Sequence, residues 1–289
     1  MKQLLLRAEE KRKLAKQVQD HLDSSPEVRP FPAAVTRLLA ACQDSKATAA
    51  TFESIIECDP ALSIRLLRLV NSPLFGLTDK VKDIAHAVVL VGNTRLKTLA
   101  MSVAGASMFT GSDEAQQYRT SLWNHSVGCA VVAQQLGKKV PGVHTDNAFL
   151  SGIFHDVGKL LFYDIAPKEY SELSRACNHE QLIGEEAFIF GKTHEEIGLQ
   201  SSHSWDLPNE IKYAIGWHHR PTEAPGFEEH TTLIGIADQL AHHWGIGSDI
   251  DETEDLETTL IEKYELSDEY LEELKATVEE QYAETIKGS

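Results

Sequence analysis

The sequence predicts an all-α protein. Three observations support that fold class: apolar residues recur every three or four positions, no segment shows the polar–apolar alternation of a strand, and proline, glycine or capping residues separate the periodic segments. The chain has 289 residues, which is long enough to bury a substantial apolar core. Its hydrophobic fraction of 42% and charged fraction of 25% are ordinary for a globular protein and exclude collagen-like and low-complexity classes.

The first half of the chain is expected to form a series of short helices. It opens with an amphipathic helix over 1–23, whose apolar stripe includes Leu14, Val18 and Leu22. Asp59-Pro60 predicts a helix start, because aspartate accepts hydrogen bonds from free amides and proline suits the first turn. The other helices of this half are expected at 33–41, from Thr51 onward, at 61–71, and at 83–91 and 95–109 on either side of Gly92.

The second half is also expected to be helical, after a boundary at Thr110-Gly111-Ser112-Asp113. Its helices are expected at 115–137, 146–164, 167–178, 181–190, 193–204, 208–218 and 230–243, with two more at 253–264 and 268–284. We therefore divide the chain into an N-terminal amphipathic helix (1–25), a first helical lobe (26–110), a second helical lobe (111–247) and acidic C-terminal helices (248–289).

The charge of the chain is negative and unevenly distributed. The net charge of −17 argues against a protein that binds nucleic acid by neutralising its phosphates. Residues 249–289 include 15 acidic and 3 basic side chains, a net of −12, which leaves only −5 for the rest of the chain. This tail is expected to present a solvated helical face, although a dimer element or a partner docking site would also fit.

Cysteine usage and hydropathy predict a cytoplasmic protein. The 4 cysteines are scattered without a CxxC pair, which argues against a disulfide scaffold or a thiolate zinc site and suits a reducing compartment. Charged residues appear too early at the N-terminus for a signal peptide. No apolar run reaches the roughly 18 residues that a membrane span needs, so we expect no membrane contact.

The chemistry of the chain is expected at a set of histidines and aspartates. The sequence has 13 histidines, and several of them stand in apolar helical segments. A buried imidazole or carboxylate without a partner costs roughly 1–3 kcal/mol, and sharing a metal removes that cost. Imidazole and carboxylate together suit first-row metals such as Fe, Mn, Co, Ni or Zn. Any one of these residues alone would fit a core or surface position, but together they predict a metal cluster of His125, His155, Asp156, His194, His218, His219 and Asp238.

The order of these residues resembles a known family. The pattern H…HD…H…HH…D is similar to the HD superfamily of metal-dependent phosphohydrolases, and the strings HDVGKL, KTHEEIG, WHHRP and IADQLA resemble its HD-GYP branch. Upstream, the strings DPAL, LRLVNSPLFG and IAHAVVLVG resemble the HDOD family, whose members are output domains of bacterial signalling proteins. The resemblance implies an HD-type helical bundle over 111–247 with an N-terminal helical HDOD lobe over 26–110.

The resemblance also implies a ligand set and catalytic residues. One divalent transition-metal ion would be held by His125, His155, Asp156 and Asp238, and a second by Asp156, His194, His218 and His219, with Fe, Mn, Ni or Zn as candidates. Two such ions would activate water for attack on phosphorus. Asp156 would be catalytic as the shared ligand, and Lys159, one helical turn after His155, is a candidate for holding a phosphate oxygen. Arg220 is a second candidate for phosphate binding, and either cation would otherwise be a surface residue.

Two departures from the related families narrow these expectations. The GYP element is absent after His219, so cyclic di-GMP is not the expected substrate. Ser121 stands where some HD-GYP enzymes carry a glutamate for a third metal, so we expect two ions at most. Glu186, eight residues before His194, would either orient a ligand or lie on a helix surface. Core or surface positions are expected for Trp123, Trp205, Trp217, His86, His144, His179, His203 and His242.

These observations favour an HDOD signal-transduction protein with a dinuclear metal site that hydrolyses a nucleotide or another phosphodiester. The alternative is a catalytically inactive HDOD scaffold that regulates signalling by binding a protein partner, and a purely structural helical protein is a third hypothesis. Fold alone does not decide between them. The expected partners are a signalling protein acting in trans and a phosphate-containing small molecule, with no membrane and no direct nucleic-acid contact.

Overall fold

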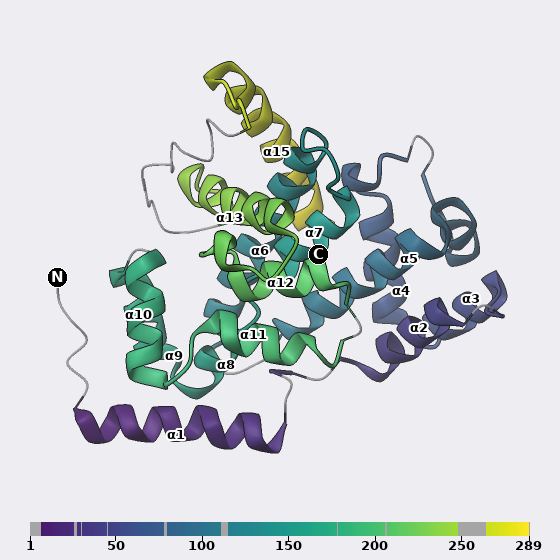
Figure 1. The fold of residues 1–289 in the computed structure, drawn as a ribbon. Coiled ribbons are helices and arrows are strands. Elements are labelled where there is room, and N and C mark those ends of the chain that lie inside the picture. The colour runs from purple at the N-terminus through teal and green to yellow at the C-terminus, as the bar shows by residue number, and fades with distance from the viewer. Residues whose placement is uncertain are drawn as a thin grey trace. The chain divides into compact units, whose positions relative to one another are not determined.

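The computed structural model describes residues 7–25, 28–29, 31–44, 46–77, 80–110, 115–177, 179–205, 207–247 and 264–288. Over these ranges every regular element is an α-helix or a short 3₁₀ helix, which confirms the all-α fold class (Figure 1). None of the helices in the described ranges is long and apolar enough to cross a membrane. The predicted helix at 253–264, apart from Tyr264, and the predicted boundary at 111–113 lie outside the described residues.

The chain divides into two compact units. Unit 1 comprises Met1–Arg29 and Phe109–Asp268, and unit 2 comprises Pro30–Met108 and Glu269–Ser289. All the residues expected to carry chemistry belong to unit 1.

Unit 2 is built around one long, kinked helix. Helix α5 (Ile84–Met108) packs against α2 (Ala33–Gln43), α3 (Ala49–Glu57) and α4 (Pro60–Val70). Its backbone leaves the helical region at Gly92, where φ is 70°, as the sequence predicts. Asp59 caps α4 as expected, since its carboxylate accepts a hydrogen bond from the amide of Leu62 at 3.1 Å. The 3₁₀ helix η1 (Pro73–Phe75) and helix α15 (Asp268–Gly288) complete the elements assigned wholly or mainly to this unit.

Unit 1 is centred on helix α6 (Gln116–Gly137), which packs against α7 (Thr145–Phe154) and α13 (Glu228–His243). Its last thirteen residues, 125–137, are all buried, so α6 forms the core of the unit. Around it lie α8 (Lys159–Ile165), α9 (Pro167–Ala176), α10 (His179–Phe190), α11 (His194–Ser202), α12 (Asn209–Trp217) and the 3₁₀ helix η2 (Pro221–Glu223).

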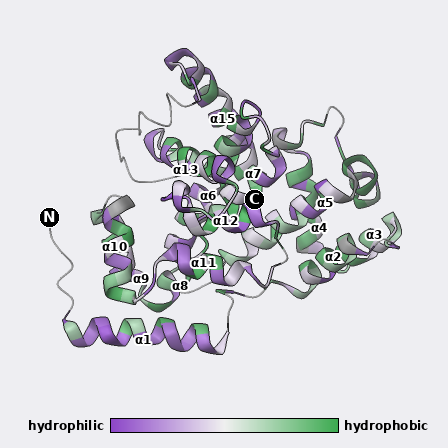
Figure 2. Ribbon diagram, in the orientation of Figure 1, coloured by the Kyte–Doolittle hydropathy of each residue, from purple (hydrophilic) through white to green (hydrophobic). Residues whose placement is uncertain are grey.

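Helix α1 (Ala8–Ser24) packs against α8 and α10 of the same unit (Figure 1). Figure 2 shows it as largely hydrophilic, in keeping with a narrow apolar stripe. That stripe buries Val18 and Leu22, as the sequence predicts, while the ammonium of Lys11 lies 3.8 Å from the centre of the Phe188 ring on α10.

The prediction of a single helix over 146–164 is wrong. The structure has two helices, α7 and α8, separated by a turn at residues 155–158 that contains His155 and Asp156. Within the turn the backbone tightens to i→i+3 hydrogen bonds, such as Val157 N to Phe154 O at 3.1 Å. The side chains of His155 and Asp156 converge in this turn, with Nε2 of His155 3.4 Å from Oδ2 of Asp156.

Glycines allow the helices around this turn to approach closely. A Cβ on Gly152 would lie 2.4 Å from Cα of Ala130, at the crossing of α7 and α6. A Cβ on Gly158 would lie 2.0 Å from the carbonyl oxygen of His194, at the start of α11. Because the obstructing atoms are backbone, no side-chain rotation could relieve either contact. The two glycines therefore set how near the turn lies to α6 and α11.

Replacing Gly152 by alanine is expected to destabilise the protein by about 1–3 kcal/mol, because the added methyl overpacks the crossing of α6 and α7. Gly184→Ala on α10 is the matched control, since a Cβ there meets no described atom within 4 Å. Alanine favours a helix interior over glycine by roughly 0.5–1 kcal/mol, so this control should be slightly stabilised. Urea unfolding at equilibrium measures both changes. Equal stability of the two variants would contradict the close approach of α7 to α6 at Gly152.

Candidate metal centre

Five segments of unit 1 bring their polar side chains to one buried centre. Helix α6 carries His125, and the turn after α7 carries His155 and Asp156. His194 is the first residue of α11, and Asp238 lies on α13. His218 and His219 directly follow α12. All of these residues are buried except His219, which is half-buried. The structure thus brings together every residue of the predicted metal cluster.

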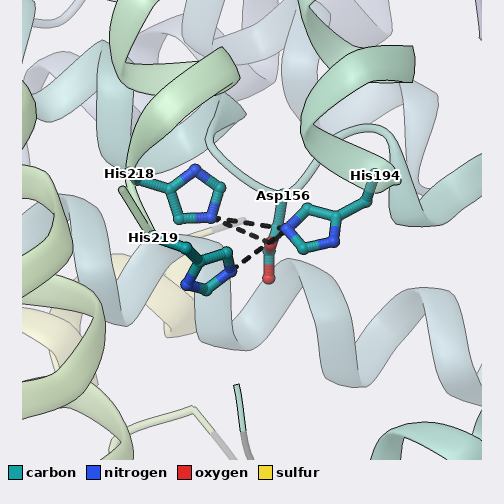
Figure 3. Close-up of side chains that lie close together, drawn as sticks. All are labelled: Asp156, His194, His218 and His219. Carbon is teal, nitrogen blue, oxygen red and sulfur yellow. Dashed lines mark hydrogen bonds and ion pairs between the residues drawn. The ribbon is translucent and has the colours of Figure 1, made fainter. Parts of the chain in front are cut away.

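One half of the centre surrounds the Oδ1 atom of Asp156 (Figure 3). The Nε2 atoms of His194 and His218 lie 3.4 and 3.7 Å from it. The Nε2 atom of His194 also lies 3.2 Å from Nε2 of His219. One ligand atom from each of these four residues falls within 4.8 Å of the others, which suits a shared cation.

The other half faces the Oδ2 atom of Asp156. The Nε2 atom of His155 lies 3.4 Å from Oδ2 and 3.5 Å from Oδ1 of Asp238. The Nε2 atom of His125 lies 2.8 Å from Oδ1 of Asp238 and 3.9 Å from Oδ2 of Asp156. The carboxylate of Asp156 therefore presents one oxygen to each half, as a shared ligand would.

The tautomers of the rings show that this centre fits a cation. In three rings the Nδ1 atom is bonded to an oxygen that can only accept, so Nδ1 carries the proton: Gly152 O for His155 (2.8 Å), the Glu186 carboxylate for His194 (2.8 Å) and Ala214 O for His218 (3.1 Å). Burial lowers the pKa of His218, so in that neutral ring Nε2 holds a lone pair directed at the cluster. Nε2 of His155 and Oδ1 of Asp156 are buried without a hydrogen-bond partner. Nε2 of His218 lies 3.7 Å from Oδ1 of Asp156, and these two acceptors repel unless a cation lies between them.

The carboxylates of the centre attract positive charge. Burial alone would raise the pKa of Asp156, but the ammonium of Lys159 at 2.6 Å and the His155 ring hold it well below its usual range. Burial alone would lower the pKa of His155, but the Asp156 carboxylate raises it well above its usual value. Burial likewise opposes charge on Lys159, yet Asp156 and Asp238 raise its pKa. Lys159 is only 8% exposed, so it is not a surface lysine.

Arg220 lies beside the centre and is engaged with carboxylates. Its Nη2 donates to Oε2 of Glu195 at 2.8 Å, and Nη1 donates to Glu223 at 3.4 Å. Glu195 is fully buried, and its other oxygen accepts from the backbone amide of His219 at 3.2 Å. Arg220 and Glu195 thereby tie the turn after α12 to the start of α11. The sequence analysis did not single out Glu195, because nothing local distinguishes it from the exposed Glu196 that follows.

Glu186 is buried, so the surface alternative for it is wrong. Its carboxylate accepts from both the backbone amide and Nδ1 of His194 at 2.8 Å. It also accepts from the hydroxyl of Tyr170 at 2.5 Å. Glu186 fixes the ring orientation and tautomer of His194, as residues behind metal ligands commonly do.

His242 lies closer to the centre than the sequence analysis expects. Its Nε2 is 3.6 Å from Oδ1 of Asp238, and its ring stacks on His125 with centroids 4.2 Å apart. The signal that could have found it is its spacing of four residues from Asp238 on one helix. Of the other residues expected at core or surface positions, Trp205 is buried, Trp123 and Trp217 are half-buried, and His86, His144 and His203 are exposed.

Comparison with known proteins places this fold and sequence among HDOD proteins. The HDOD domain family matches residues 28–221. An uncharacterized protein of Treponema pallidum (strain Nichols) is 27% identical over 225 residues, which cover 77% of this chain and 42% of the relative. The chain therefore spans about two-fifths of the length of that curated relative.

Solved structures share the fold at low sequence identity. An HDOD domain protein of unknown function from Geobacter sulfurreducens superposes with a TM-score of 0.73 at 22% identity, covering 96% of this chain and 99% of that one. A Shewanella amazonensis SB2B protein provisionally named a metal-dependent phosphohydrolase gives a TM-score of 0.66 at 20% identity, with 95% and 99% coverage. At these identities the likeness shows the fold alone.

Glu186→Gln is expected to destabilise the protein by about 1–3 kcal/mol, because the amide nitrogen cannot accept the hydrogen bonds that the lost oxygen received. The matched control is Glu185→Gln, the neighbouring half-buried position on α10, which should change stability by less than about 0.5 kcal/mol. Denaturant midpoints of the metal-free proteins compare the two. A Glu186 variant as stable as its control would show that this carboxylate does not hold His194.

Proposed function

This chain belongs to the HDOD domain family, and on that basis we propose that it is a signalling protein with a dinuclear metal centre that hydrolyses a phosphodiester or nucleotide. The observation that carries the proposal is the buried set of ring nitrogens and carboxylate oxygens around Asp156. Imidazole and carboxylate in this ratio suit divalent first-row metals.

The chain supplies ligands for two ions that share Asp156. His125, His155 and Asp238 would complete one set, and the three remaining histidines, His194, His218 and His219, would complete the other. When bound, the ions supply Lewis acidity and an activated water for attack on phosphorus. The rings of His155, His194 and His218 are held in advance by hydrogen bonds on their Nδ1 atoms, so these three side chains need little ordering when a metal binds.

Lys159 is the residue of this chain best placed to hold a phosphate oxygen. Its ammonium is charged, buried, and 2.6 Å from Oδ2 of Asp156. A metal ion that neutralises Asp156 would free the ammonium to bind an anion. The provisional name of the Shewanella neighbour supports the same class of reaction. Phosphohydrolysis therefore uses the metal ligands and the buried cation together.

A specific observation favours a second function, that of an inactive scaffold which binds a signalling partner in trans. Both cations expected to hold phosphate are already paired, Lys159 with Asp156 and Arg220 with Glu195. In that function the metals stabilise the helical lobe, while Lys159 and Arg220 stay paired with these carboxylates. Turnover, not metal content, separates the two functions.

Elemental analysis of the purified protein tests the premise that both functions share, namely that the chain binds two metal ions. We expect about two equivalents of Fe, Mn, Ni or Zn per chain. Asp156→Ala should lose most of that metal, because it removes the ligand common to both sets. Asp20→Ala, at an exposed position on α1, should keep the wild-type content. Less than about 0.2 equivalents in the wild type after growth and reconstitution with added metal would contradict a metal centre.

The metal-loaded wild type is then assayed on bis(p-nitrophenyl) phosphate and on nucleotides. Release of p-nitrophenol or phosphate by the wild type and by Asp20→Ala, but not by Asp156→Ala, would support the hydrolase. A fully loaded wild type that releases neither product would favour the scaffold instead.

A further inference from the structure

His242 stands at the edge of the metal centre without a role in the predicted ligand set. It lies on α13, four residues after Asp238, so the two side chains share one face of the helix. The two atoms Nε2 of His242 and Oδ1 of Asp238 are 3.6 Å apart. One ligand atom each from His125, Asp238 and His242 falls within 4.8 Å of the other two.

These three side chains form a set of two imidazoles and one carboxylate. Such a set binds divalent first-row metals when its atoms converge and its rings are held. Its members come from α6 and α13, which pack directly against each other. The side chains of His125 and Asp238 are almost fully buried, whereas that of His242 is 14% exposed. His242 is therefore the ligand of this set nearest to solvent.

A simpler role for His242 would be to hold His125 by ring stacking. The two ring centroids are 4.2 Å apart and the planes are inclined by 27°, which is a stacked arrangement. Stacking needs only a flat ring, whereas metal binding needs the Nε2 atom. Nε2 of His242 lies on the side of Asp238, which favours metal binding over stacking alone. A variant that keeps the ring but lacks the nitrogen separates the two roles.

We propose that His242 is a further metal ligand, which completes the coordination of the ion held by His125 and Asp238. The inference rests on the metal centre of the proposed function and extends it by one residue. Because His242 is the most exposed of the three, its donor atom controls how readily this ion exchanges with solvent. The ion bound by His194, His218 and His219 does not depend on it.

The test is a titration of metal-free protein with Mn²⁺ or Co²⁺. Calorimetry measures the binding of either ion, and visible absorption also measures the binding of Co²⁺. His242→Ala removes ring and donor, and His242→Phe keeps a stacking ring but removes the donor. His243→Ala changes the exposed neighbour at the end of α13 and serves as the control. Far-ultraviolet circular dichroism verifies that each variant folds.

The wild type and His243→Ala should each bind two ions, and each ion should bind to both proteins with the same affinity. Both His242 variants should bind one of the two ions at least about tenfold more weakly and leave the other unchanged. Wild-type affinity in His242→Phe would show that the ring only positions His125, which overturns the inference. Wild-type affinity in both variants would also overturn it. A wild type that binds no metal would instead defeat the proposed function on which the inference rests.

Discussion

The structure of unit 1 depends on a cluster of buried acceptors that requires positive charge. Two aspartates and five histidines meet in a space from which water is largely excluded, with Asp156 at its middle. Uncompensated, such groups are costly to bury, and the cost rises as the surroundings become less polar. The chain itself supplies one ammonium, on Lys159, and a raised pKa on His155. Divalent ions, as proposed, would supply the same compensation more completely, because each acceptor would gain a direct bond.

The rest of the unit serves to hold these acceptors in place. The buried residues 125–137 of helix α6 form the core, and the glycines at 152 and 158 let the turn that carries Asp156 approach α6 and α11. Behind the cluster, Glu186 and Glu195 hold His194 and His219 through hydrogen bonds that do not involve the ring nitrogens facing the cluster. Preorganisation of this kind reduces the entropy lost on binding and selects one coordination geometry.

Much of this arrangement could be predicted from the sequence, for local reasons. Asp59 as a cap, Gly92 as a helix break, and the buried face of α1 follow from the side chains and their spacing. The order of the histidines and aspartates predicted which residues converge. The break at 155–158 could not be predicted, because no proline stands there and the single glycine, Gly158, would also be tolerated inside a helix. The sequence analysis also missed the pairing of Arg220 with Glu195, because these residues are 25 positions apart in the sequence. It missed His242, because only the packing of α13 shows that this side chain lies beside Asp238 at the centre.

Anomalous X-ray scattering at the absorption edge of the bound metal tests the central claim most directly. In crystals of the metal-loaded protein, the account predicts two anomalous peaks beside the Asp156 carboxylate. One should lie among His194, His218 and His219, and the other against His125 and Asp238. The account would be contradicted if no anomalous density lay near Asp156 and its oxygens were bonded only to Lys159 and protonated histidines.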